Sequence, residues 1–122
     1  MTIEREHMPI LLVEDDPLIA LGAEDMLRTA GFDCLLAYDT QMAGALLESR
    51  DIRAAILDYD LGDETSLGLA EQVFASRIPY AFVTGRNRGE IMGQAPDPVA
   101  IHAKPVDYAD VARQLAQHAA AA

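Results

Sequence analysis

The stretch Pro9-Ile-Leu-Leu-Val-Glu-Asp-Asp-Pro17 decides the fold of this chain. It is a short apolar run that ends in three acids and then in a proline. An apolar run of this length is typical of a strand that is buried on both faces, as in a parallel sheet. Asp16 is a good helix N-cap and Pro17 suits the first helical position, so the stretch predicts a strand at about 9–14 that leads directly into a helix.

Three further apolar runs have the same form, and each is closed by a residue that can do chemistry. These are Ala54–Leu57 before Asp58, Tyr80–Val83 before Thr84, and Val99–Ala103 before Lys104, the only lysine. If all four runs are parallel strands, their ends lie at one edge of a sheet, where ligand sites form in open α/β sheets. Acids, a hydroxyl and an ammonium would then converge, and that set suits a metal ion and a phosphoryl group.

The rest of the chain alternates in the same way, which predicts an α/β domain with a parallel sheet and five β/α units. Besides the strand at about 9–14, strands are expected at about 32–38, 53–58, 80–83 and 99–103. Helices are expected to begin at Pro17, at 39 or 40, at about 66, at about 88 and after Asp107. The first of these helices is expected to end before Gly31.

Three segments receive more specific predictions. Tyr59–Thr65 is expected to be a loop. The stretch Gly85–Pro98 contains three glycines and two prolines, so we expect only a short or irregular fourth helix at about 88–93. The first helix is expected to bury the apolar residues that recur at helical spacing, which are Ile19, Ala23, Met26, Leu27 and Ala30.

Composition bounds the kind of protein. The 122 residues, 51% of them apolar, suit one domain with a real core, so we expect a single domain over 1–122, with its core at about 9–118 and no output domain. The net charge of −11 disfavours nucleic acid as a partner. No apolar stretch approaches the ~20 residues that span a bilayer, and Met1–Met8 is too polar for a signal peptide. The single Cys34 fits a reducing compartment, so we expect a cytoplasmic protein without a membrane partner.

The acids that close the first run are the strongest chemical signal. Clustered carboxylates such as Glu14 and Asp15 are costly unless a cation neutralises them, and hard oxygen ligands suit Mg²⁺. The residues that close the other three runs are weak signals one by one, because each also has an ordinary structural explanation. The prediction of a site depends on the order and spacing of all four together.

Four motifs, Ile10-Leu-Leu-Val-Glu-Asp-Asp-Pro-Leu-Ile19, Ala55-Ile-Leu-Asp58, Phe82-Val-Thr-Gly85 and Ala103-Lys-Pro105, occur in this order, and with them the chain resembles the receiver domain of two-component response regulators. The resemblance covers about 9–118. It implies the flavodoxin-like strand order 2-1-3-4-5. It also implies a cytoplasmic phospho-acceptor signalling domain rather than an enzyme. Such a domain uses Mg²⁺ or Mn²⁺, takes its phosphoryl group from a sensor histidine kinase or a histidine phosphotransfer protein, and signals through protein–protein contacts.

The resemblance implies a role for each motif residue. Asp58 would be the phospho-acceptor and a metal ligand, and Asp15 the direct metal ligand, with Glu14 helping through water. The main-chain carbonyl of Asp60 would complete the metal site. Thr84 would bind a phosphoryl oxygen and report whether the site is occupied, and Lys104 would pair with Asp58 or with the phosphoryl group.

The chemistry of these residues supports the same assignment independently. A carboxylate that attacks phosphorus needs the charge on the equatorial oxygens neutralised in the transition state. Mg²⁺, the Lys104 ammonium and the Thr84 hydroxyl can provide that, so catalysis would consist of positioning and electrostatics.

The chain departs from the family pattern in three places that concern the output signal. Ile101 stands where receivers usually carry an aromatic residue, three residues before Lys104. His102 could replace it, although a structural role is more common for a strand histidine. The loop after Asp58 lacks the usual proline, for which Gly62 could supply backbone freedom. The short fourth helix is the third departure.

Asp60 and Arg86 each lie two residues beyond a site residue, Asp58 and Thr84 respectively. We expect them to pair across the mouth of the pocket and to restrict the water that hydrolyses the aspartyl phosphate. The alternative is a pair of solvated charges that contributes almost nothing.

Two other classes of protein stay open. Asp58-Tyr-Asp60 also resembles the Asp-x-Asp motif of haloacid-dehalogenase-type phosphatases, in which Asp58 would be the nucleophile and Asp60 the general acid. The metal acids of that family follow the lysine, whereas Glu14 and Asp15 precede the nucleophile, and the chain is short for such an enzyme. The other class is an interaction module that keeps the fold without using the site.

Overall fold

Residues 4–121, with the side chains of 4–118, are described by a computed structural model, so both ends of the predicted domain 1–122 lie outside the described residues. One parallel sheet dominates this part of the chain. Its strands are β1 (Ile10–Val13), β2 (Cys34–Ala37), β3 (Ala54–Asp58), β6 (Tyr80–Thr84) and β7 (Ala100–Ala103). Two further strands, β4 (Asp60–Leu61) and β5 (Glu64–Thr65), form a separate antiparallel hairpin.

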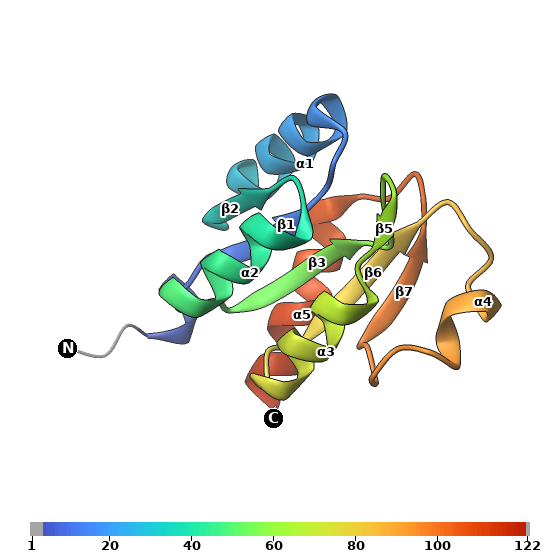
Figure 1. Ribbon diagram of the computed structural model, residues 1–122. Helices are drawn as coiled ribbons and strands as arrows, with labels where there is room; N and C mark the ends of the chain where they lie inside the picture. The colour runs from blue at the N-terminus through green and yellow to red at the C-terminus, as the bar shows by residue number, and fades with distance from the viewer. Residues whose placement is uncertain (1–3, 122) are drawn as a thin grey trace.

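The strands of the large sheet lie in the order β2-β1-β3-β6-β7, which confirms the predicted order 2-1-3-4-5. All four neighbouring pairs are parallel. Each strand lies inside its predicted range or extends one residue beyond it. The predicted doubly wound α/β architecture is therefore correct (Figure 1).

Helices cover both faces of the sheet, as Figure 1 shows. They are α1 (Pro17–Thr29), α2 (Thr40–Ser49), α3 (Leu67–Ala75), α4 (Gly89–Met92) and α5 (Tyr108–Ala121), and a 3₁₀ turn, η1 (Arg5–His7), precedes the first strand. Helices α1 and α5 pack in one core with Ile10 and Leu12, while α2, α3 and α4 share the other core with Leu11 and Val13. Alternate residues of β1 thus enter opposite cores, which explains its unbroken apolar sequence. None of the helices within 4–121 is long and apolar enough to cross a membrane.

The helices begin and end at residues with the expected chemistry. Asp16 accepts hydrogen bonds from two amide groups of the first turn of α1, which begins with Pro17. Asp39 and Asp107 cap α2 and α5 in the same way. Gly31, with a φ of 94°, follows the end of α1 in the left-handed region that favours glycine.

The predicted buried face of α1 was partly wrong. The residues that α1 buries are Ala20, Ala23 and Leu27, whereas Ile19 and Met26 are 39% and 45% exposed. Ala23 and Leu27 pack in the core shared with the sheet and α5, and the small side chains of Ala20 and Ala23 let the helix backbone approach closely. The apolar residues to one side of that buried face are left at the surface.

The predictions for the two irregular segments, Tyr59–Thr65 and Gly85–Pro98, had different outcomes. Tyr59–Thr65, expected to be a loop, contains the β4–β5 hairpin, in which Asp60 pairs with Thr65 and Leu61 with Glu64. The expectation of a short fourth helix is confirmed, because α4 has four residues and buries only Ile91.

Candidate functional site

The ends of four strands bring the predicted site residues to one edge of the sheet. Val13 pairs with Leu57, so Glu14 lies beside Asp58. Asp58 pairs with Val83, the residue before Thr84. Thr84 in turn pairs with Ala103, the residue before Lys104. The parallel register alone therefore brings Asp58, Thr84 and Lys104 to the same place as the acids that follow the first strand.

Lys104 joins two of the acids directly. Its Nζ donates hydrogen bonds to Glu14 Oε1 and to Asp58 Oδ2, each at 3.1 Å. Glu14 is 1% exposed and Asp58 8% exposed, so both carboxylates are largely withdrawn from water. One ammonium group is therefore shared by two buried acids.

The buried group contains two acids, Glu14 and Asp58, but only one base, Lys104. Burial, together with the neighbouring Asp58 carboxylate, raises the pKa of Glu14 to about 8. Burial alone would lower the pKa of Lys104, but the hydrogen bonds to Asp58 and Glu14 raise it. Two buried carboxylates thus compete for one cation, and a second positive charge would relieve the repulsion that remains.

The residues present fit a divalent cation. Carboxylate oxygens of Glu14, Asp15 and Asp58 all lie within 4.8 Å of one another. Glu14 Oε2 is buried and has no hydrogen-bond partner among the described residues, which is unusual for a buried oxygen. Asp15 is exposed, so the group opens to solvent on one side. Hard oxygen ligands with access to water are typical of Mg²⁺ sites.

Thr84 is the last residue of β6, one residue beyond the partner of Asp58 in the sheet. The side chain is fully buried at the end of β6, and its Oγ1 accepts a hydrogen bond from the backbone N–H of Arg86 at 3.0 Å. The backbone N–H of Lys104 donates to the Thr84 carbonyl at 2.8 Å, which fixes β7 against β6. A hydroxyl can donate one hydrogen bond while it accepts another, so Thr84 can still donate to an anion.

Asp60 and Arg86 form the ion pair that their positions predicted. Arg86 Nε lies 3.0 Å from Asp60 Oδ1 and 2.8 Å from Oδ2. The guanidinium also lies 5.8 Å above the Tyr59 ring and 3.8 Å from Glu90. Both partners are largely exposed, so solvent screens the attraction between them.

Ser66 is a residue of the site that the sequence analysis missed. It is fully buried, and its Oγ donates a hydrogen bond of 2.7 Å to the backbone carbonyl of Asp58. Its N–H donates to the carbonyl of Tyr59 at 2.9 Å. A serine before a helix usually caps that helix, but Ser66 makes no such bond to α3 and instead holds the end of β3.

Strand β7 contains Ile101, which stands where receivers usually carry an aromatic residue, and its neighbour His102. Ile101 is largely buried and belongs to the core shared with α2, α3 and α4. His102 Nε2 lies 2.8 Å from Gln114 Oε1, a hydrogen bond between β7 and α5. The histidine therefore has a structural partner.

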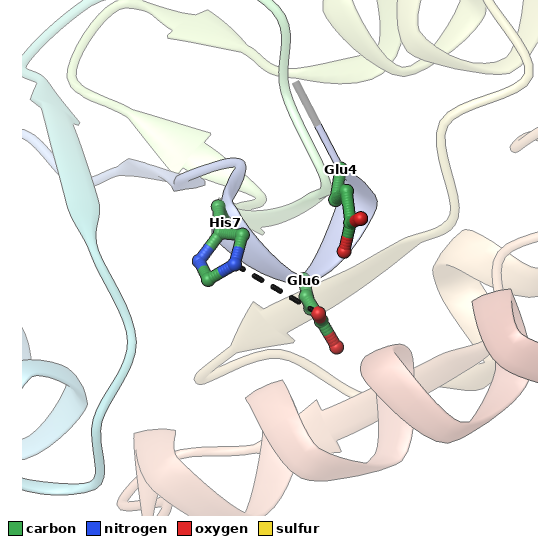
Figure 2. A group of neighbouring side chains, drawn as sticks. All are labelled: Glu4, Glu6 and His7. Atoms are coloured by element: carbon green, nitrogen blue, oxygen red, sulfur yellow. Dashed lines mark ion pairs between the residues drawn. The ribbon is translucent and has the colours of Figure 1, made fainter. Parts of the chain in front are cut away.

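A second group of possible metal ligands lies at the η1 turn and the residue before it, ahead of β1 and so away from the carboxyl ends of the strands. Glu4, Glu6 and His7 are all exposed, and Figure 2 shows the imidazole of His7 facing the Glu6 carboxylate, 3.8 Å away. Exposed acids of this kind are common on protein surfaces, so this cluster lacks the burial that marks the group around Lys104.

Comparison with known proteins identifies the fold. The chain matches no family model. It is 27% identical over 112 residues to the phyllosphere-induced regulator PhyR of Methylorubrum extorquens; the match covers 88% of this chain and 42% of that protein. The chain thus spans about two fifths of the length of this curated relative.

Solved structures resemble the chain over nearly its full length. The signal receiver domain of an HD domain-containing protein from Pseudomonas fluorescens superimposes with a TM-score of 0.82 and 22% identity, over 99% of this chain and 94% of that one. A Burkholderia pseudomallei response regulator with a phosphorylated aspartic acid and a calcium ion gives a TM-score of 0.82 and 19% identity, over 93% and 69%. The chain therefore has the fold of a response regulator receiver domain, and the resemblance drawn from the motifs is confirmed.

Proposed function

We propose that this chain is a receiver that accepts a phosphoryl group on Asp58 from a histidine kinase or a histidine phosphotransfer protein. The observation that carries the proposal is the buried Asp58 carboxylate, held 3.1 Å from Lys104 beside the acids of β1. The phosphorylated aspartic acid of the Burkholderia regulator supports it by analogy. No enzymatic turnover of an external substrate is expected.

The transfer is a single displacement at phosphorus. A carboxylate oxygen of Asp58 attacks, and the bond from phosphorus to the donor's imidazole nitrogen or acyl oxygen breaks, so the donor leaves with the electron pair. Lys104 and Thr84 neutralise the oxygens of the moving phosphoryl group by charge and by hydrogen bonding. Mg²⁺ or Mn²⁺ held by Glu14, Asp15, Asp58 and the carbonyl of Asp60 would add positive charge to the same oxygens.

The geometry of Asp60 disfavours the phosphatase alternative. A general acid must approach the leaving group of its substrate, whereas both oxygens of the Asp60 carboxylate are engaged by the Arg86 guanidinium. The acids beside Asp58 also come from the first strand rather than from a segment after Lys104.

The test is to incubate the purified protein with acetyl phosphate and Mg²⁺ and to follow its intact mass. One phosphoryl group per chain is the expected result. Repeated turnover of a small phosphate ester, without a single stoichiometric labelling, would favour the phosphatase. If the protein is not labelled and does not bind Mg²⁺, an interaction module is favoured.

The proposed setting follows from the same function. The donors are cytoplasmic signalling proteins, so we expect this chain in the cytoplasm. The net charge of −11 opposes direct contact with nucleic acid, so the output is expected to be a protein contact. The downstream protein would bind the surface around β7. This surface includes the short α4 and Ile101, two of the departures from the usual receiver pattern.

Mg²⁺ is expected to raise the thermal midpoint, because it relieves repulsion among Glu14, Asp15 and Asp58 and binds only the folded state. At ten times the dissociation constant, the gain is about 1.4 kcal/mol, or about 5 °C for a domain of this size. Differential scanning fluorimetry at constant ionic strength measures the shift. Asp15→Asn should remove most of it, and an unchanged midpoint in wild-type protein at millimolar Mg²⁺ would exclude the metal site.

Arg86→Ala is expected to shorten the lifetime of the aspartyl phosphate, because the Asp60–Arg86 pair restricts water at the mouth of the pocket. The expected increase in hydrolysis rate is about threefold, a small effect that is typical of an exposed ion pair. Loss of the phosphoryl group is followed by intact mass after removal of the donor.

The matched control for this change is Arg88→Ala, which removes an exposed arginine two residues further on for which the structure shows no ion pair within the described residues. Asp60→Asn should accelerate hydrolysis as Arg86→Ala does, and the double variant should add nothing further. Equal rates in wild type and Arg86→Ala would remove the role of the pair.

A further inference from the structure

The β4–β5 hairpin lies directly against the proposed metal pocket. It follows Asp58 after a single residue, and its turn contains Gly62 with a φ of 68°. A Cβ on Gly62 would lie 3.8 Å from Asp15 Oδ2, so the backbone of the turn passes beside a proposed metal ligand. The strand β4 begins with Asp60, whose carbonyl is the expected fourth ligand. The placement of this hairpin therefore affects two ligands of the pocket.

A carboxylate from the hairpin is bound to a different part of the fold. Glu64, in β5, accepts hydrogen bonds from the Thr40 backbone N–H at 3.2 Å and from the Thr40 hydroxyl at 2.9 and 3.0 Å. Thr40 is the first residue of α2. A helix N-terminus has unpaired amide groups and a positive partial charge, so it attracts a carboxylate.

The contact between Glu64 and Thr40 stabilises the hairpin more than it stabilises α2. Asp39 already caps α2 through a 2.7 Å bond to the Met42 N–H. The first turn of α2 contains no acid of its own, and Glu64 supplies that charge from 24 residues away in the sequence. A two-stranded hairpin is marginal by itself, so it depends on such external contacts. Leu61, which is buried, anchors only the inner side of the hairpin.

We propose that Glu64 is a positioning residue for the metal pocket. By joining β5 to the N-terminus of α2, it holds the hairpin so that the carbonyl of Asp60 and the turn at Gly62 keep their places beside Asp15. The Asp60–Arg86 pair holds the other strand against the segment after β6. This inference rests on the proposed function in one respect, that the pocket binds Mg²⁺.

The test measures Mg²⁺ affinity by isothermal titration calorimetry, a readout that does not depend on phosphorylation. Glu64→Ala is expected to weaken Mg²⁺ binding about tenfold, the low end of the effect of removing a residue that orients a ligand. Thr40→Val should weaken it in the same direction, because the hydroxyl bond is lost while the net charge is kept. Thr40→Ser keeps the hydroxyl and should bind as the wild type does.

Two controls separate positioning from charge and from stability. Asp63→Asn removes an exposed acid from the turn of the same hairpin, so it reports the loss of one negative charge near the pocket without loss of the contact to α2. The thermal midpoint without Mg²⁺ should change little in Glu64→Ala, because Asp39 still caps α2. At saturating Mg²⁺, its phosphorylation rate should return to that of the wild type.

The outcomes distinguish the two proposals. If the wild type does not bind Mg²⁺, the metal site and the proposed function fail together. If the wild type binds Mg²⁺ and Glu64→Ala binds it equally well, only the positioning role is overturned. An equal loss of affinity in Asp63→Asn and Glu64→Ala would show that charge alone is responsible, and it would also overturn that role.

Discussion

Asp58→Asn is expected to abolish phosphorylation by acetyl phosphate while the protein stays folded. The amide has nearly the shape of the carboxylate but lacks the anionic oxygen that attacks phosphorus. Lys104 keeps its hydrogen bond to Glu14 in this variant. Repulsion between Asp58 and Glu14 disappears, so the thermal midpoint without Mg²⁺ should equal or exceed that of the wild type. Intact mass and a thermal melt on the same preparation measure both effects.

The matched control is Asp51→Asn, which makes the same chemical change at an exposed residue before the start of β3, at the opposite end of that strand. It should accept a phosphoryl group as the wild type does. Full labelling of Asp58→Asn would show that a different carboxylate is the acceptor, and peptide mapping would then locate it.

The large sheet and the meeting of the site residues could be predicted from the sequence because both follow from local patterns. An unbroken apolar run of four or five residues cannot place one face in water, so it indicates a strand covered on both sides. Once the strands are parallel, their carboxyl ends share one edge, and Asp58, Thr84 and Lys104 must approach one another. The side-chain distances of 3.1 Å from Lys104 to its partners depend on packing and could not be predicted.

The β4–β5 hairpin could not be predicted because its strands are two residues long and mostly polar. Such short strands carry no periodic signal. Their pairing is supported by contacts with distant residues, Thr40 on α2 and Arg86 after β6. The role of Ser66 was hidden for a related reason, since its partner is the backbone of Asp58, eight residues earlier, instead of the helix it precedes.

Helical periodicity alone could not determine which face of α1 is buried. The predicted stripe, which is Ile19, Ala23, Met26, Leu27 and Ala30, fits helical spacing as well as the observed stripe of Ala20, Ala23 and Leu27 does. The two stripes share Ala23 and Leu27. Hydrophobicity favours the first stripe, but the close approach of α1 to the sheet and α5 selects the second. The larger side chains therefore remain partly exposed.

Lys104→Met is expected to slow phosphorylation by acetyl phosphate about 100-fold at saturating Mg²⁺, the effect of removing one preorganised group that stabilises transition-state charge. Methionine keeps much of the length and the apolar part of the side chain. Without Mg²⁺ the variant should melt at a lower temperature, because Glu14 and Asp58 lose the cation that they share. Pseudo-first-order rates from intact mass measure the first effect.

The response to Mg²⁺ separates a chemical role of Lys104 from a general loss of structure. In the Met variant no ammonium group competes for the carboxylates, so Mg²⁺ should raise its thermal midpoint by more than in the wild type. Lys104→Arg retains the charge and should recover most of the stability, but its broad guanidinium cannot reproduce the compact ammonium between two acids, so the rate should stay low. A Met variant that is phosphorylated at the wild-type rate would mean that Lys104 stabilises the buried acids and takes no part in the transfer.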